Sequence, residues 1–445
     1  RWIRTGKILL DHIVGSGKAQ PLDAKILTPG GWKRMGDMAI GDIVIAGDGA
    51  PTVVEAVFPQ GEKDIYRVIF SDGSSTECCE EHLWLTQTYM ERGYAQRGGK
   101  KGKKWLCGAG KVRPLAEIRD SLIAPHLGAK NHSIPIVSPV QFVAREVPIE
   151  PYLLGVLLGD GNFTHGGVSI TTADQEIIAE CALLLPLGMK LGSVKTGDRC
   201  STWTLTNEQP SRSKENPIKV ALEQLGLRGR GSHDKFIPDS YLFNFVEARI
   251  ELLRGLMDTD GSVQKKGMST YFYTTSPALA DGVTALVQSL GGTAGRSEKL
   301  PTYRHNGELL HGAPCAVLCI SMPASINPFH LTRKAKAVVP KTSYAPHRYI
   351  VAVESVGKKP AQCIRVSHPS HLYVTDDFIV THNTFTIVAA LMEMRRIGLV
   401  QKPMIVVPNH LVEQWAISFY QLYPGAKILA MRKADFTKQN RRKML

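Results

Sequence analysis

The sequence predicts an all-β domain that is interrupted by an α/β domain, with a short flank of different character at each end. Three observations support this architecture. Short alternating strands separated by glycine turns occupy 19–95 and return in 341–383. The segment 150–340 holds two similar apolar helical motifs, after a basic, glycine-rich linker at 96–149. The flanks 1–18 and 384–445 carry two parts of one motif, which only removal of the intervening chain would unite.

Composition limits the class of protein and its partners. The chain has 445 residues, of which 43% are hydrophobic and 21% charged, as in a soluble globular protein of two or three domains. The net charge of +14 favours a polyanionic partner such as double-stranded DNA. The 8 cysteines form no CxxC pair, which disfavours structural zinc and predicts reduced thiols.

No apolar run reaches the roughly 18 residues of a membrane helix, and no secretory signal is visible. We therefore expect a cytoplasmic monomer, from a bacterial or phage host, with no membrane partner.

The first flank ends in an incomplete phosphate-binding loop. Gly15, Gly17 and Lys18 have the spacing of such a loop, but Ala19 stands where a hydroxyl should bind Mg²⁺. Deleting 19–383 joins Lys18 to Thr384 and restores the contiguous motif at a helix start. We therefore expect these glycines, Lys18 and Thr384 to bind ATP and Mg²⁺ only after the flanks are joined.

The second boundary has the residues for cutting and joining a chain. An alternating strand runs into His382, Asn383 and Thr384. The Asn amide can attack its own backbone carbonyl, the His can supply a proton, and the Thr hydroxyl can accept an acyl group. A strand ending in a polar turn would also explain the first two residues.

Together these features resemble an intein, a self-excising insert, in the phosphate loop of an ATPase similar to superfamily-two helicases. Most inteins begin with a nucleophile, which Ala19 cannot supply. Class 3 inteins lack it and carry three markers instead: a Trp two residues after the first motif histidine, a Cys opening the penultimate strand motif, and a Thr before the terminal His-Asn. The matching residues here are Trp84 after His82, Cys363, and Thr381.

The resemblance implies an all-β Hint (horseshoe) fold and cofactor-free splicing of 19–383. Cys363 would attack the Lys18 carbonyl to form a thioester, and the acyl group would pass to the Thr384 hydroxyl. Asn383 would then cyclise to release the insert, and an O-to-N shift would leave a peptide bond.

The same resemblance implies roles for further residues around the two boundaries. We expect His82 to protonate the leaving nitrogen of Ala19, Trp84 and Thr381 to position Cys363, and His371 and His382 to assist Asn383. For His82 and Trp84, a place in the core is the alternative. Cys79 stands where the family commonly has Thr, so Cys79 could be mistaken for the nucleophile.

The two helical motifs within 150–340 form an internal duplication. Each has a central glycine, Gly155 or Gly255, and ends in Asp-Gly. The motifs resemble the paired helices of LAGLIDADG homing endonucleases, and this resemblance implies that the glycines let the helices approach closely and bring Asp160 and Asp260 together. Such a pair of carboxylates favours a divalent cation, which we expect to be Mg²⁺.

These motifs resemble LAGLIDADG homing endonucleases, which implies a pseudo-two-fold α/β domain that cuts double-stranded DNA through strands placed in the major groove. The resemblance also points to Lys235 and more weakly to Lys334 or Lys336. Three alternatives remain open. The nuclease could bind without cutting, it could carry splicing-inactive β flanks, or the chain could be a helicase fragment with a regulatory insert.

Overall fold

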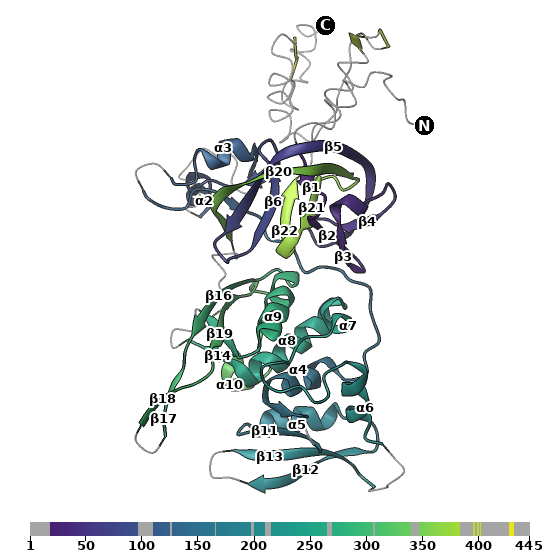
Figure 1. The fold of residues 1–445 in the computed structure, drawn as a ribbon, viewed down its shortest axis with the longest axis vertical. Coiled ribbons are helices and arrows are strands. Elements are labelled where there is room, and N and C mark those ends of the chain that lie inside the picture. Colours follow the sequence, from purple (N-terminus) through teal and green to yellow (C-terminus); the bar gives the residue numbers. More distant parts are fainter. Residues whose placement is uncertain are drawn as a thin grey trace, which may run out of the picture.

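The structure is a computed structural model. It describes 18–96, 110–124, 127–164, 166–196, 200–209, 215–264, 269–305, 308–339 and 347–382, with short pieces at 395–396, 398–399, 401 and 427–430. Within these ranges the chain forms two bodies (Figure 1), an upper one rich in strands and a lower one in which helices pack against sheets. The two flanks lie largely outside the described residues, as does the basic run 97–104.

The upper body combines two distant segments of the chain. Its first sheet has the order β1-β20-β5-β4, with β6 beside β5 and β9 beside β20; its second has the order β3-β2-β21-β22-β7-β8. The first segment contributes β1 (Gln20–Pro21), β2 (Lys25–Thr28), β3 (Gly31–Arg34), η1 (Met35–Asp37), β4 (Ile43–Ile45), β5 (Pro51–Phe70), β6 (Ser75–Cys79), β7 (Leu83–Thr86), α2 (Tyr89–Gln96), β8 (Lys111–Pro114), α3 (Leu115–Arg119) and β9 (Ser133–Ile134). The second contributes β20 (Arg348–Val366), β21 (Leu372–Thr375), η2 (Asp376–Phe378) and β22 (Ile379–His382).

The longest strand pair of this body joins the two segments. β5 and β20 run antiparallel from Phe70 paired with Ile350 to Val54 paired with Val366. Pro59-Gln60-Gly61, which lies within β5, has the composition of a turn. In the structure the pairing shifts by one residue there, and the resulting β-bulge absorbs the turn-forming residues without ending the strand.

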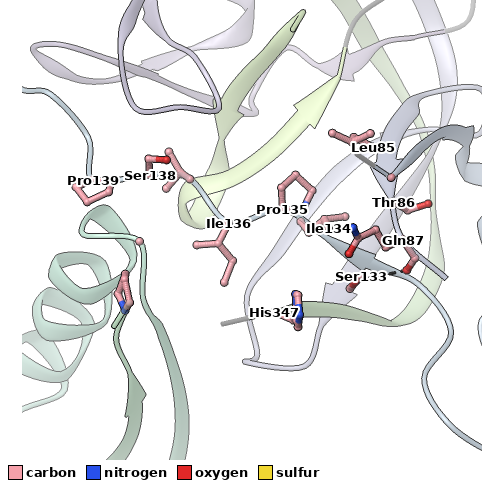
Figure 2. Close-up of a pocket in the computed structure, with 14 residues that line it drawn as sticks. Leu85, Thr86, Gln87, Ser133, Ile134, Pro135, Ile136, Ser138, Pro139 and His347 are labelled. Atoms are coloured by element: carbon pink, nitrogen blue, oxygen red, sulfur yellow. Dashed lines mark hydrogen bonds between the residues drawn. The ribbon is translucent and has the colours of Figure 1, made fainter. Parts of the chain in front are cut away.

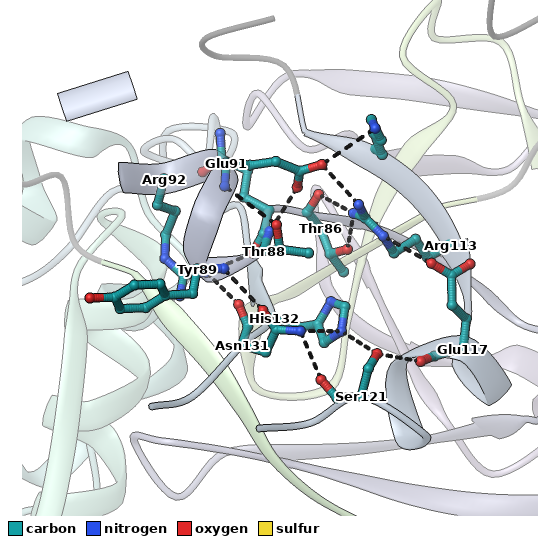
Figure 3. A network of polar contacts seen from close by, with 12 residues as sticks. Thr86, Thr88, Tyr89, Glu91, Arg92, Arg113, Glu117, Ser121, Asn131 and His132 are labelled. Carbon is teal, nitrogen blue, oxygen red and sulfur yellow. Dashed lines mark hydrogen bonds and ion pairs between the residues drawn. The ribbon is translucent and has the colours of Figure 1, made fainter. Parts of the chain in front are cut away.

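Residues 96–149 were expected to form a linker, and the structure corrects this for 111–134. β8 pairs with β7, and β9 pairs with the start of β20. A polar network, shown in Figure 3, holds this part together: Arg113 donates to the Thr86 hydroxyl at 2.9 Å and to the Glu91 carboxylate at 2.9 Å. The sequence does not predict these elements, because their strands are short and side-chain bonds to backbone hold them in place.

The lower body contains two similar halves. Its first half comprises α4 (Pro151–Asp160), β10 (Gly161–Asn162), β11 (Val168–Thr172), α5 (Gln175–Leu183), β12 (Met189–Thr196), β13 (Ser201–Asn207) and α6 (Pro217–Gln224). After α7 (Asp239–Leu242), the second half comprises α8 (Val246–Asp260), β14 (Gly261–Val263), β15 (Thr270–Thr274), α9 (Pro277–Ser289), β16 (Thr293–Lys299), β17 (Thr302–His305), β18 (Glu308–His311), β19 (Cys315–Ser321) and α10 (Thr332–Ala335).

The sheets of the two halves have matching orders, β10-β11-β13-β12 and β14-β15-β19-β16. α4 and α8 lie side by side between them (Figure 1), as expected of a duplicated unit. Of the helices that the structure describes, none is long and apolar enough to cross a membrane.

The two bodies share a hydrophobic core. It contains Leu372, Val374 and Val380 of the upper body, Phe243 of the lower body, and side chains of the connecting segment 137–142. Figure 2 shows a pocket beside this connection, lined by 133–139 together with residues of β7 and the lower body. The buried Arg249 of α8 donates to the backbone of the same connection and fixes it to the lower body.

Candidate functional site

Strand pairing brings the first boundary of the insert to Cys363. β1 pairs antiparallel with β20, Gln20 opposite Gln362 and Pro21 opposite Ala361. Carried one residue further, this register puts Ala19 opposite Cys363, and paired Cα atoms in such ladders are about 4.5–5.5 Å apart. Both residues are buried. Residue Cys363 therefore lies on the strand next to Ala19, and its thiol donates to the Ile364 carbonyl at 3.7 Å.

Hydrogen bonds hold that peptide bond at both ends. Nδ1 of His82 lies 2.9 Å from the carbonyl oxygen of Lys18. The Ala19 N–H donates to the sulfur of Cys79 at 3.1 Å, and the Cys79 N–H donates to the Ala19 carbonyl at 2.9 Å. A carbonyl oxygen can only accept, so Nδ1 of His82 carries the proton and donates it.

The other ring nitrogen of His82 contacts the hydroxyl of Thr381. Burial lowers the pKa of His82 to about 4, so the ring is neutral near pH 7 and its Nε2 accepts from the Thr381 hydroxyl. Trp84 packs edge-on against the ring, with ring centroids 5.6 Å apart. A single tautomer of His82 is thereby selected.

This geometry changes the expected role of His82. The sequence predicts that His82 protonates the nitrogen of Ala19, whereas its N–H is directed at the carbonyl oxygen of Lys18. Turn geometry explains the placement: β6 ends at Cys79, and the N–H of His82 donates to the Cys79 carbonyl at 3.1 Å. His82 therefore lies in a turn between β6 and β7.

Charges around the thiol are few and buried. Burial raises the pKa of Cys363 to about 11, and the nearby Lys18 opposes that rise. Burial likewise lowers the pKa of Lys18 to about 7, against the influence of Cys363. The two side chains therefore interact electrostatically; near pH 7 the thiol is neutral, whereas the amine of Lys18 is divided between its neutral and charged forms.

The second boundary of the insert approaches the same place. In β22, His382 pairs with Leu83, the neighbour of His82, and with Leu372. The ring of His371 lies 6.4 Å from that of His382, and burial, with the charges of Lys18 and His371 next, lowers the pKa of His382 well below its usual value. Asn383 and Thr384 lie outside the described residues, as do Gly15 and Gly17.

A second group of candidate site residues lies where the duplicated helices α4 and α8 meet. A Cβ atom added to Gly155 would lie 2.4 Å from the backbone oxygen of Leu252, and one added to Gly255 would lie 2.3 Å from that of Tyr152. The prediction that glycine permits close approach of α4 and α8 is confirmed. Any larger residue would force these two backbones apart.

Asp160 and Asp260 end these helices and influence each other. Burial and then the charge of Asp160 raise the pKa of Asp260 to about 6, while burial raises the pKa of Asp160. Lys235 and Lys334 lower both values. The part of the chain that the structure describes holds no group of three or more His, Cys, Asp or Glu residues suited to a metal. The carboxylate pair nevertheless provides the oxygen donors that Mg²⁺ prefers.

The lysines near this pair occupy corresponding places in the two halves. Lys235 donates to the carbonyls of residues 157, 159 and 161 at the end of α4, and Lys334 donates to those of 257, 258, 259 and 261 at the end of α8. Of the two weaker sequence candidates, Lys334 thus matches Lys235 and Lys336 does not. The duplication itself could have indicated that each helix end needs one lysine.

Comparisons with known proteins agree with this organisation. A LAGLIDADG-like domain matches residues 247–329, and a probable helicase domain matches 371–445. The replicative DNA helicase DnaB of Mycobacterium intracellulare is 32% identical over 391 residues, which are 86% of this chain and 61% of the relative. The chain therefore spans less than two thirds of that relative.

Two further similarities concern the insert. The homothallic switching endonuclease of Saccharomyces cerevisiae is 26% identical over 162 residues, 32% of this chain and 27% of the relative. The solved splicing domain of the Msm DnaB1 intein, bound with zinc, is 13% identical at a TM-score of 0.25, covering 82% of this chain and all of that one. The insert thus contains a LAGLIDADG-like domain, and the chain as a whole is similar to a DnaB-type helicase.

Proposed function

We propose that the chain excises residues 19–383 and joins Lys18 to Thr384, with Cys363 as the first nucleophile. The observation that carries this proposal is the strand register that brings Cys363 beside Ala19, whose peptide bond with Lys18 is hydrogen-bonded to His82. No side chain at position 19 can attack, because alanine has no nucleophilic group. Cys363 therefore supplies the sulfur for the Lys18 carbonyl carbon.

The first step makes an oxyanion on the Lys18 oxygen, and His82 is directed at that atom. A donor held in place before reaction stabilises such a charge by about 3 kcal/mol. Thr381 fixes the tautomer of His82, and Trp84 packs against its ring. Both act through His82 on the scissile bond.

The later steps take place at the second boundary. The acyl group passes from the sulfur of Cys363 to the hydroxyl of Thr384, and Asn383 then cyclises to release the insert. His382 lies one strand pair from His82 and next to His371. The two histidines are therefore placed to assist Asn383. Joining restores the phosphate loop, so the product would bind ATP and Mg²⁺ through Gly15, Gly17, Lys18 and Thr384.

The test is mass spectrometry of the full chain after expression. The unaltered chain should give a free insert of residues 19–383 and a joined flank, whereas Cys363→Ala should give neither. Cys319→Ala is the matched control, because that thiol is exposed on β19 of the lower body. Ala19→Ser should leave joining intact. A Cys363→Ala chain that still joins its flanks would contradict the assignment.

We further propose that the nested domain cuts double-stranded DNA with Mg²⁺. Asp160 and Asp260 would hold the ion, which would activate water and stabilise the leaving oxygen of a phosphodiester. Lys235 and Lys334 fix the helix ends that carry these carboxylates and reduce their mutual repulsion. The LAGLIDADG-like match over 247–329 supports this activity.

Asn substitution of either carboxylate should abolish Mg²⁺ binding and cleavage without affecting splicing. Asp281→Asn is the control, because that carboxylate is largely exposed on α9 of the same domain. Titration calorimetry with Mg²⁺ measures binding separately from cleavage. If Asp160→Asn and Asp260→Asn proteins both bind Mg²⁺ normally, the site lies elsewhere.

A further inference from the structure

The strand that follows the scissile bond is short and offers few backbone hydrogen bonds. β1 consists of Gln20 and Pro21 and lies at the end of its sheet, next to β20. Proline has no backbone N–H, so Pro21 cannot donate to the ladder with β20. The proposed function, on which this inference rests, nevertheless needs β1 to keep Ala19 in register with Cys363.

The side chain of Gln20 supplies further hydrogen bonds, although it is fully buried. Its amide oxygen accepts from the hydroxyl of Tyr373 at 2.8 Å. Its amide nitrogen donates to the hydroxyl of Thr375 at 3.0 Å and to that of Thr76 at 3.3 Å. The first strand of the insert is therefore bonded through one side chain to both β21 and β6.

The orientation of this amide is fixed by the bonds that its neighbours make. The Thr375 hydroxyl donates to a backbone carbonyl of β2 at 2.9 Å, and the Thr76 hydroxyl donates to the Asp376 carboxylate at 2.7 Å. A hydroxyl has one proton, so both of these groups can only accept from Gln20. The amide nitrogen must face the two threonines, which leaves its oxygen for the phenol.

Tyr373 connects Gln20 to the second boundary of the insert. It pairs directly with Thr381 of β22, and directly opposed residues of an antiparallel pair have their side chains on the same face. The Thr381 hydroxyl contacts the ring of His82, which donates to the Lys18 carbonyl. The scissile carbonyl and the strand that follows it are thus both tied to the pair formed by β21 and β22.

We propose that Gln20 and Tyr373 are positioning residues for thioester formation. The Tyr373 hydroxyl holds the Gln20 side chain, and this side chain keeps Ala19 in register with Cys363. Cleavage at the first boundary then requires that β21 is in place. The upstream flank is therefore not released before the second boundary has assembled.

The surroundings of the phenol suit this role. Burial raises the pKa of Tyr373 well above its usual value, and the nearby Cys363 adds to the rise, so the phenol keeps its proton and donates it. The ring belongs to a buried cluster that includes Ile26, Val54 and Ile364. Removing the hydroxyl alone therefore leaves the packing of the ring intact.

The experiment measures the first step in the full chain. Asn383→Ala with Thr384→Ala blocks the later steps, and dithiothreitol then releases the upstream flank from the thioester on Cys363. In this background Tyr373→Phe removes the hydroxyl, and Gln20→Met removes the amide at a similar side-chain length. We expect each change to slow release by about 5- to 150-fold, the effect of one unsatisfied buried polar group on a rate.

Tyr241→Phe is the matched control. Tyr241 is also buried, and its hydroxyl donates to the Ile149 carbonyl at 2.7 Å and accepts the Ile149 N–H at 3.1 Å. It belongs to α7 of the lower body, so its loss should lower stability to urea while the release rate stays unchanged. A Tyr373→Phe rate within about twofold of the parent, or an equal slowing by Tyr241→Phe, would overturn the positioning role.

A double variant tests whether the two residues act through their shared bond. Gln20→Met combined with Tyr373→Phe should react no more slowly than Gln20→Met alone, because the bond between them is already lost. Effects that multiply would show that the hydroxyl of Tyr373 does not act through Gln20, and would contradict the inference.

Hydrogen exchange measures the position of β1 without any reaction. In a Cys363→Ala chain, in which the first boundary stays intact, Tyr373→Phe should speed exchange of the backbone amides within 19–22, whereas Tyr241→Phe should not. Unchanged exchange in the Tyr373→Phe chain would mean that the hydroxyl does not hold β1, and the inference would be wrong.

Failure of this inference can be distinguished from failure of the proposed function. If Cys363→Ala abolishes release while Tyr373→Phe does not affect it, only the positioning role is wrong. If Cys363→Ala still releases the upstream flank, the proposed function is wrong at its first step, and this inference falls with it.

Discussion

Thr381→Val provides the sharpest test of how the scissile carbonyl is activated. Valine has nearly the same shape as threonine, so the change removes a hydroxyl at a fully buried position without opening a cavity. Nε2 of His82 then loses its donor, and an unsatisfied buried polar atom costs about 1–3 kcal/mol. The ring can avoid that cost only by leaving the arrangement in which Nδ1 donates to the Lys18 oxygen.

We therefore expect thioester formation to slow by about 5- to 150-fold, since each 1.36 kcal/mol corresponds to tenfold in rate. The assay is the release of residues 1–18 by dithiothreitol from the Cys363 thioester, in a chain in which Asn383→Ala and Thr384→Ala block the later steps. Thr381→Ser restores the hydroxyl and should recover most of the rate. If the valine variant reacts within about twofold of the parent, the orientation of His82 does not depend on Thr381.

Three further predictions concern the lower body and the stability of the upper one. Gly155→Ala places a methyl group against the backbone of α8, so urea unfolding should show a loss of about 1–3 kcal/mol, whereas Gly167→Ala, where nothing lies near, should not. Mg²⁺ affinity measured by calorimetry should fall as pH drops through about 6, because the raised pKa of Asp260 lets it take up a proton there and lose its charge. Arg348→Met breaks a buried ion pair of 2.9 Å with Asp72 and should cost about 3–5 kcal/mol of unfolding free energy, less if Asp72→Asn is added.

The sequence contains enough to predict the family and the paired helices. Gly155, Gly255 and the terminal aspartates repeat at corresponding places, and a duplicated pattern is hard to obtain without a duplicated structure. The alternation around Thr381 likewise predicts the strand that presents His382.

Other features depend on contacts between distant residues and leave no local signal. The β-bulge at Pro59–Gly61 needs β20 as a partner, and no pattern within β5 indicates it. The direction of the His82 N–H depends on a turn after Cys79 and on the hydroxyl of Thr381, nearly 300 residues later. The strands and helix within 111–134 are held in place by side-chain hydrogen bonds such as those from Arg113 to Thr86. The spacing of residues in the sequence does not predict these bonds.

The hydrophobic core shared by the two bodies limits how this insert could be shortened. Removing the nuclease domain would take away Phe243 and the anchoring Arg249, and would expose Val374 and Val380 to water. A miniature version would therefore need polar replacements on the newly uncovered face to remain monodisperse. Relatives that lose the nuclease domain should change Val374 and Val380 at the same time. Their shortened chains should then carry polar side chains on the face that the nuclease domain would otherwise cover.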